Sequence, residues 1–143
     1  MLSFTRGVLA LRRRYAVFRT GAFLPGQEAA GSAAHWIRVS GGVMTEADWH
    51  DRGRHSIAVL LETDVQQAGE PGAITPIGAT RIALLLNGGG AVVQQQLPVG
   101  RWRLMLDTAR PGAESESLTG AVDVAGFSVV LLEQEATSRS LVP

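Results

Sequence analysis

The side chains best suited to chemistry in this sequence are three histidines and two pairs of neighbouring carboxylates. These are His35, His50 and His55, Asp48 with Asp51, and Glu114 with Glu116. No two histidines stand three or four residues apart, the helical spacing that turns two imidazoles toward one metal ion, so structural histidines are expected. The carboxylate pairs fall in a short capped turn and in a Gly- and Ser-rich loop, which do not fix the separation that acid/base catalysis requires. We therefore expect no catalytic residue, no metal and no cofactor.

A glycine-rich segment, Asn87-Gly88-Gly89-Gly90, is a further candidate, because backbone N–H groups in such loops can hold a phosphate. It precedes a strand pattern rather than a helix, so it lacks the helix N-terminus that usually faces the phosphate. We interpret it as a hairpin turn whose residues tolerate positive φ. The sequence also lacks the Gly-x-Ser-x-Gly and Ser-x-x-Lys motifs of serine nucleophiles.

The three tryptophans allow two uses, packing and binding. Trp102 alternates with Leu104 and Leu106 and is predicted to lie in the core. Trp36 and Trp49 flank the capped turn, and we favour buried rings that fix an irregular loop. The alternative is a carbohydrate-binding surface, because an aromatic face on a β-scaffold can stack on the apolar C–H face of a sugar. Exposed rings in a shallow groove would favour binding, and buried rings would favour packing.

Composition limits the partners of this 143-residue chain. Hydrophobic residues make up 45% and charged residues 18%, as in a globular domain. The formal net charge is +0, so the chain has no overall field to collect nucleic acid or an anionic membrane, and it has no apolar run long enough to span one. Without cysteine, disulfides and thiolate chemistry are excluded. We expect a cytoplasmic protein.

The elements that position these residues begin with one helix, predicted over residues 3–15. Phe4, Val8, Leu11 and Tyr15 recur at i, i+4, i+7 and i+11 and form one apolar stripe. A helix this short is marginal in water unless its stripe is buried, so something must cover it. A mitochondrial presequence is a competing interpretation of this arginine-rich segment, which has no acidic residue before Glu28.

After the helix, the pattern changes to short apolar runs between turn residues, which is typical of a β-sandwich. The predicted strands cover residues 35–39, 56–62, 81–87, 91–97, 101–107, 120–124 and 127–133. We expect 81–87 and 91–97 to pair as a hairpin. Thr45 and Asp48 predict a capping box and a single helical turn, and residues 64–80 contain too many Gly and Pro for a regular element. The fold class is therefore an all-β, antiparallel β-sandwich of about seven strands preceded by one N-terminal α-helix.

Several segments resemble one family. They are residues 11–19 (LRRRYAVFR), 22–24 (AFL), 35–36 (HW), 42–49 (GVMTEADW), 54–57 (RHSI), 84–87 (LLLN) and 127–132 (FSVVLL). They are similar, in order over about residues 2–133, to the C-terminal region of bacterial glycogen debranching enzymes of the isoamylase type, in the α-amylase superfamily of glycoside hydrolases. The sequence departs from the family at Tyr15-Ala16, where His-Pro is usual, and at Gly88-Gly89-Gly90, where relatives often have Ala-His-His.

The resemblance implies a parent enzyme with a (β/α)₈ barrel that hydrolyses α-1,6 branch linkages, with its two catalytic Asp and one Glu upstream of this chain. Residues 1–24 would be the last barrel helix and exit segment, and 25–136 a non-catalytic C-terminal β-sandwich domain that stabilises or frames the barrel. Residues 137–143 look derived from a cleavage tag. The alternative function is an autonomous carbohydrate-binding module, and an unrelated small enzyme is a third. Beyond the barrel, the expected partner is a second copy, bound through Phe4, Val8, Leu11 and Tyr15.

Overall fold

The fold was obtained as a computed structural model, which describes residues 2–19, 32–63 and 80–135. Its helical elements are α1 (Leu2–Arg14), the 3₁₀ turn η1 (Ala16–Phe18) and α2 (Glu46–His50). Its strands are β1 (Ser32–Ile37), β2 (Ser56–Thr63), β3 (Thr80–Asn87), β4 (Val93–Gln96), β5 (Trp102–Asp107), β6 (Ser117–Leu118), β7 (Ala121–Val124) and β8 (Ser128–Gln134). The predicted boundary at residue 24, nearly all of the predicted loop 64–80 and the tail 137–143 lie outside the described residues.

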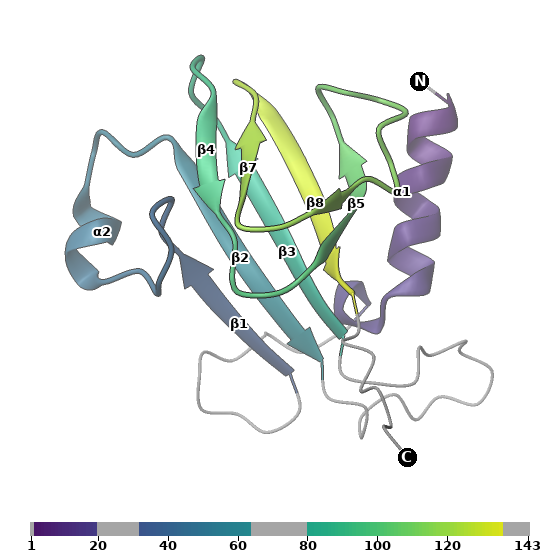
Figure 1. The fold of residues 1–143 in the computed structure, drawn as a ribbon, viewed down its shortest axis with the longest axis horizontal. Helices are drawn as coiled ribbons and strands as arrows, with labels where there is room; N and C mark the ends of the chain where they lie inside the picture. The colour runs from purple at the N-terminus through teal and green to yellow at the C-terminus, as the bar shows by residue number, and fades with distance from the viewer. Residues whose placement is uncertain (1, 20–31, 64–79, 136–143) are drawn as a thin grey trace.

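The strands form two antiparallel sheets (Figure 1). The larger has the order β1-β2-β3-β8-β5-β6, and the smaller pairs β4 with β7. This confirms the predicted all-β, antiparallel fold with one N-terminal helix. The two-residue strand β6 was not predicted, because Ser117 and Leu118 are too few to show a period. No helix in the described part of the chain is long and apolar enough to cross a membrane.

The core between the two sheets is apolar. Trp102 and Leu104 of β5 are fully buried there, as predicted for Trp102, and Val122 and Val124 reach them from the smaller sheet. The other members are Ile37, Ala58, Leu60, Ala83, Leu85, Val130 and Leu132. Alternation along each strand places these residues on one face of the larger sheet. The opposite face is therefore free to receive the helix.

A second core joins that opposite face to the C-terminal end of α1. Tyr15 and Val17 pack on Val59, Leu61, Ile82 and Leu131. The predicted helix is confirmed, but its stripe is divided: Tyr15 is buried and Leu11 half-buried, whereas Phe4 and Val8 remain 48% and 38% exposed. The helix thus covers its own sheet with only the last turn of its apolar stripe.

Charged groups surround this junction of helix and sheet. Arg14 lies 3.7 Å from Glu133 of β8, and Arg103 of β5 binds the same carboxylate. The buried Tyr15 hydroxyl faces Glu133 without a hydrogen bond of good geometry. Burial, and then the neighbouring Glu133 carboxylate, raise the pKa of Tyr15 to about 12. The phenol therefore stays neutral at physiological pH, so no phenolate is buried beside the Glu133 carboxylate.

The predicted hairpin of residues 81–87 with 91–97 is wrong. Strand β3 pairs with β2 and β8, and β4 pairs with β7. None of Gly88, Gly89 and Gly90 has positive φ, so these glycines do not form the expected tight turn. The segment instead carries the chain from the larger sheet to the smaller one. Buried Asn87 holds it there, donating from Nδ2 to the carbonyls of Ala91, at 2.8 Å, and Val124, at 3.0 Å.

Strand β5 departs from the predicted alternation at Met105. Its register on β8 shifts between Leu104, which lies opposite Leu132, and Leu106, which lies opposite Leu131. This β-bulge turns Leu106 to the helix-side core, away from Trp102 and Leu104. The expected common face of Trp102, Leu104 and Leu106 is therefore wrong for Leu106, because one extra residue reverses the alternation.

Candidate functional site

The first candidate site is a pair of tryptophan rings at the edge of the larger sheet. Trp36 belongs to edge strand β1 and Trp49 to α2, which lies beside β1 on the side of the molecule opposite α1 (Figure 1). The ring centroids are 5.5 Å apart, with an interplanar angle of 77°. Trp36 is 40% exposed and Trp49 51% exposed, so the expectation of buried rings is wrong. The rings pack on each other, and both keep surface open to solvent.

A capping box fixes the start of α2, as the sequence predicts. The Thr45 Oγ1 accepts a hydrogen bond from the Asp48 N–H at 3.4 Å, and the Asp48 carboxylate accepts one from the Thr45 N–H at 2.8 Å. The two contacts satisfy N–H groups that a helix start otherwise leaves unpaired. They form between residues three apart, so the local sequence is sufficient to specify them.

Asp48 also joins α2 to the segment that follows it. The Arg54 Nη2 donates to the Asp48 Oδ1 at 2.7 Å, and the Arg54 Nε donates to the Asp48 carbonyl at 3.1 Å. The Thr45 N–H, the Thr45 hydroxyl and then the Arg54 guanidinium lower the pKa of Asp48 from its usual value. The Met44 N–H donates to the Trp36 carbonyl at 2.9 Å, which ties this segment to β1. Trp49 is therefore presented from a fixed backbone.

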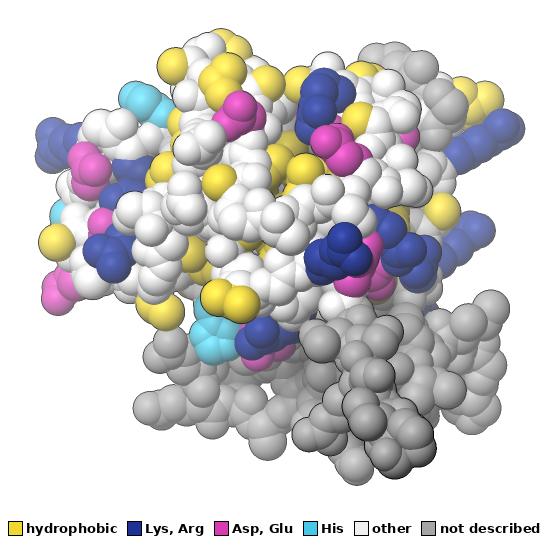
Figure 2. Space-filling model, in the orientation of Figure 1, with side chains coloured by type: hydrophobic (Ala, Val, Ile, Leu, Met, Phe, Trp, Pro, Cys, Tyr) yellow, Lys and Arg dark blue, Asp and Glu magenta, His cyan; other side chains and the backbone are white. Residues whose placement is uncertain are grey.

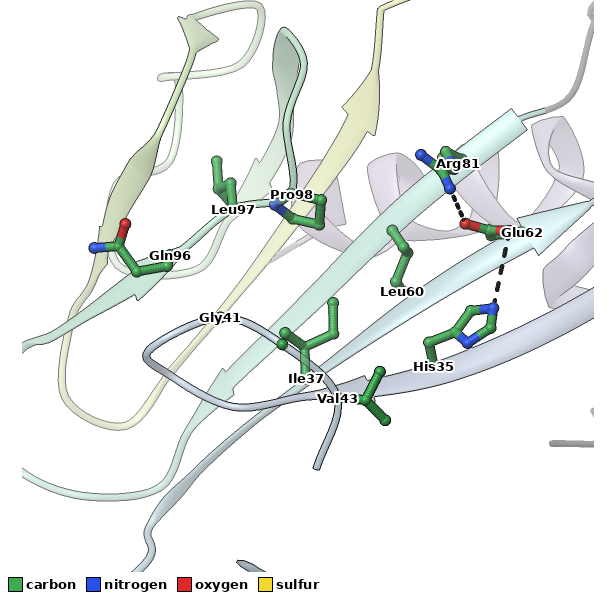
Figure 3. A pocket seen from close by; sticks show the side chains of 11 residues that line it. His35, Ile37, Gly41, Val43, Leu60, Glu62, Arg81, Gln96, Leu97 and Pro98 are labelled. Atoms are coloured by element: carbon green, nitrogen blue, oxygen red, sulfur yellow. Dashed lines mark ion pairs between the residues drawn. The ribbon is translucent and has the colours of Figure 1, made fainter. Parts of the chain in front are cut away.

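The second candidate site is a groove of about 440 Å³ on the other face of β1 (Figure 3). Ile37 and Leu60 supply apolar lining, and Leu97 and Pro98 face them across the groove. The polar lining includes His35, Glu62, Arg81 and Gln96. Glu62 is paired with Arg81 and lies 3.9 Å from the His35 Nε2. Because Arg81 already neutralises Glu62, this cluster does not provide the free carboxylate that a general base would need.

Three of the other predicted chemical residues, His50, Asp51 and Glu116, have local structural contacts. The Asp51 Oδ1 accepts from the Gly53 N–H at 2.9 Å, and the His50 Nδ1 lies 2.8 Å from the Glu46 carbonyl. Glu116 lies 3.5 Å from Arg110. Within residues 2–19, 32–63 and 80–135, no three His, Asp or Glu side chains are grouped so as to hold a metal ion. On the face drawn in Figure 2, basic and acidic side chains are interspersed rather than gathered by sign.

The similarity of the chain to known proteins is limited. No protein-family model and no curated protein match the sequence. Among solved structures, the chain is similar to a pullulanase from Anoxybacillus sp. LM18-11, complexed with maltotetraose, at 18% identity and a TM-score of 0.41. The match covers 57% of this chain and 10% of that one, so the chain spans about a tenth of the pullulanase. A similarity at this level does not establish the family of the chain.

Two buried acids, Asp107 and Glu133, were missed in the sequence. Asp107 ends β5, and its carboxylate accepts from the Ala109 N–H at 2.9 Å and from the Arg110 Nε at 2.8 Å. An Asp followed by Thr-Ala-Arg-Pro-Gly is a turn signal that could have indicated this role. Its contacts terminate the strand, so its function is structural.

Proposed function

We propose that this chain is a non-catalytic β-domain at the carboxy-terminal end of a glycogen debranching enzyme, which stabilises or frames the preceding catalytic barrel. The resemblance of segments 11–19 and 42–49 to that family supports the assignment. The structural observation that carries it is the divided stripe of α1. Tyr15 attaches the helix to the sheet, while Phe4 and Val8 present apolar surface away from it. A helix shared between two bodies is expected to show this division.

The state of the carboxylates also supports a non-catalytic role. Asp107 is bound by Arg110, Glu133 by Arg103 and Arg14, and Glu62 by Arg81. Each of these acids connects strands or closes a turn. Glycoside hydrolysis needs one carboxyl group that can give up a proton and a second carboxylate facing the same bond. Acids neutralised by arginine are poor candidates for either role.

We expect the purified chain to release no reducing sugar from glycogen, pullulan or limit dextrin. The family's catalytic Asp and Glu residues would all lie in the barrel, outside these 143 residues. A reducing-sugar assay checks this, with the Glu62→Gln variant as the matched control because it removes the acid lining the groove. Turnover that is present in the natural chain and lost in the variant would contradict the proposal.

Without the barrel, the exposed apolar residues Phe4 and Val8 of α1 are expected to contact a second copy of the chain. Leu11 and Tyr15 are already engaged with the sheet, so Phe4 and Val8 would carry this contact rather than the whole stripe. Sedimentation at micromolar concentration should show a dimer, and Val8→Asp should give the monomer mass. Val99→Asp changes an equally apolar, exposed residue elsewhere and should leave the dimer intact. A monomeric natural chain would refute this association.

A second candidate function, an autonomous carbohydrate-binding module, is favoured by one observation. Both Trp36 and Trp49 are exposed, as binding requires, and they lie outside the groove on the other face of β1. The two functions are compatible, because a domain that packs on a barrel can also hold substrate on its outer surface. Their tests are separate, since binding without turnover would leave the first proposal intact.

A further inference from the structure

We propose that Trp36 and Trp49 form a contact site for an α-1,4-linked glucan chain and that Asp48 is its positioning residue. The inference rests on the second candidate function above. It adds the class of ligand and the arrangement of the two rings that would bind it. Three observations carry it: the exposure of both rings, the hydrogen bonds that position α2 and the angle between the ring planes.

The exposed surface of both rings suits a sugar. A pyranose ring has an apolar C–H face that can lie on an indole, while its hydroxyl groups remain in water. Large aromatic side chains supply such contact area at low cost in conformational entropy, and their polar N–H can serve a neighbouring hydroxyl. Because the ligand keeps most of its hydroxyl groups hydrated, this contact requires no deep pocket.

Hydrogen bonds rather than burial hold α2 in its position. The helix has five residues and none of them is buried, yet a capping box and the Arg54 side chain fix it in place. Burial of α2 therefore contributes little stability. What these contacts do define is the position of Trp49 relative to Trp36. A ring pair that is ordered before binding loses less conformational entropy when the ligand arrives.

The angle between the rings selects the shape of the ligand. At 77°, the two planes cannot both lie under a flat ribbon, so a chain that contacts both rings must turn between its sugar units. Chains of α-1,4-linked glucose turn in this way, whereas β-1,4-linked chains are extended and flat. The geometry therefore favours malto-oligosaccharides over cello-oligosaccharides.

Calorimetric titration with maltoheptaose and with cellohexaose tests the proposal. We expect saturable binding of maltoheptaose and at least about tenfold weaker binding of cellohexaose. Trp36→Ala and Trp49→Ala should each weaken maltoheptaose binding by about tenfold or more, as expected for aromatic anchors. Phe127→Ala is the matched control, because Phe127 is an aromatic residue 79% exposed elsewhere on the surface, and it should leave binding unchanged.

The role of Asp48 needs a readout that a general loss of stability would not produce. Asp48→Asn keeps the size of the side chain but removes the charge that holds Arg54. We expect weaker maltoheptaose binding together with a loss of the near-ultraviolet circular dichroism of the coupled Trp36–Trp49 rings, at an unchanged far-ultraviolet spectrum. A variant that binds like the natural chain would remove Asp48 from the site.

Other outcomes overturn the glucan site itself. No binding of maltoheptaose, equal binding of cellohexaose, or binding that survives both tryptophan variants would each do so. These failures are separate from failure of the barrel-packing proposal, which the hydrolysis and sedimentation experiments test.

Discussion

Replacing Trp102 by alanine should remove about 3–5 kcal/mol from the free energy of unfolding, the usual cost of deleting a buried aromatic side chain. The ring is fully buried between the sheets, and its Nε1 donates to the Pro98 carbonyl at 3.0 Å. Alanine would leave both a cavity and an unpaired carbonyl. Domains of this size are stable by about 5–15 kcal/mol, so the loss is a large part of the total. Urea denaturation followed by circular dichroism measures it.

The matched control for this prediction is Trp49→Ala. That ring is half exposed and packs on the ring of Trp36, so its removal should cost about 1 kcal/mol or less. The two variants remove the same atoms from a core and from a surface. Similar losses in both would mean that Trp102 does not occupy the closed core between the sheets.

Gly126→Ala should also destabilise the fold, by about 1–3 kcal/mol or more, as overpacking of a closed site does. A Cβ at this position would overlap the Gly90 carbonyl and lie 2.9 Å from the Gly89 oxygen. The clash is with backbone, which cannot rotate away. The Phe127 N–H donates to the same Gly89 carbonyl at 3.0 Å and holds the two segments together. Thermal unfolding of the variant should therefore begin at a lower temperature.

Gly7→Ala provides the opposite result for comparison. Gly7 lies inside α1, where a Cβ would meet no atom within 4 Å, and alanine is favoured over glycine in a helix by about 1 kcal/mol. This variant should unfold at a slightly higher temperature. A neutral Gly126→Ala variant would mean that residues 89–90 do not approach residue 126 closely.

Features encoded by neighbouring residues were predictable from the sequence. The stripe through Phe4, Val8, Leu11 and Tyr15 located α1, because its period is visible within thirteen residues. The capping box of Thr45 and Asp48 was found for the same reason. Strands β2 and β3 followed from uninterrupted apolar runs, and Trp102 from its alternation with Leu104.

Features that depend on distant residues were not predictable. The partners of β3 are β2 and β8, and β8 lies more than forty residues further along the chain, so the expected local hairpin failed. The bulge at Met105 places Leu104 in one core and Leu106 in the other, and no pattern in the neighbouring sequence indicates it. Trp36 and Trp49 were identified as candidates, but their exposure depends on the position of β1 at the sheet edge and of α2 outside the core. Whether a strand lies at the edge or in the centre of a sheet depends on the topology of the whole fold.

The position of β8 has a consequence for the order of assembly. It is the last strand in the described part of the chain, yet it lies at the middle of the larger sheet, between β3 and β5. During synthesis on a ribosome, β1, β2 and β3 can pair early. Strand β5 can join them only after β8, which pairs with both β3 and β5, has been made. During that interval, two apolar strand edges are open to other chains. The unfinished sheet is therefore most open to pairing with other chains during synthesis.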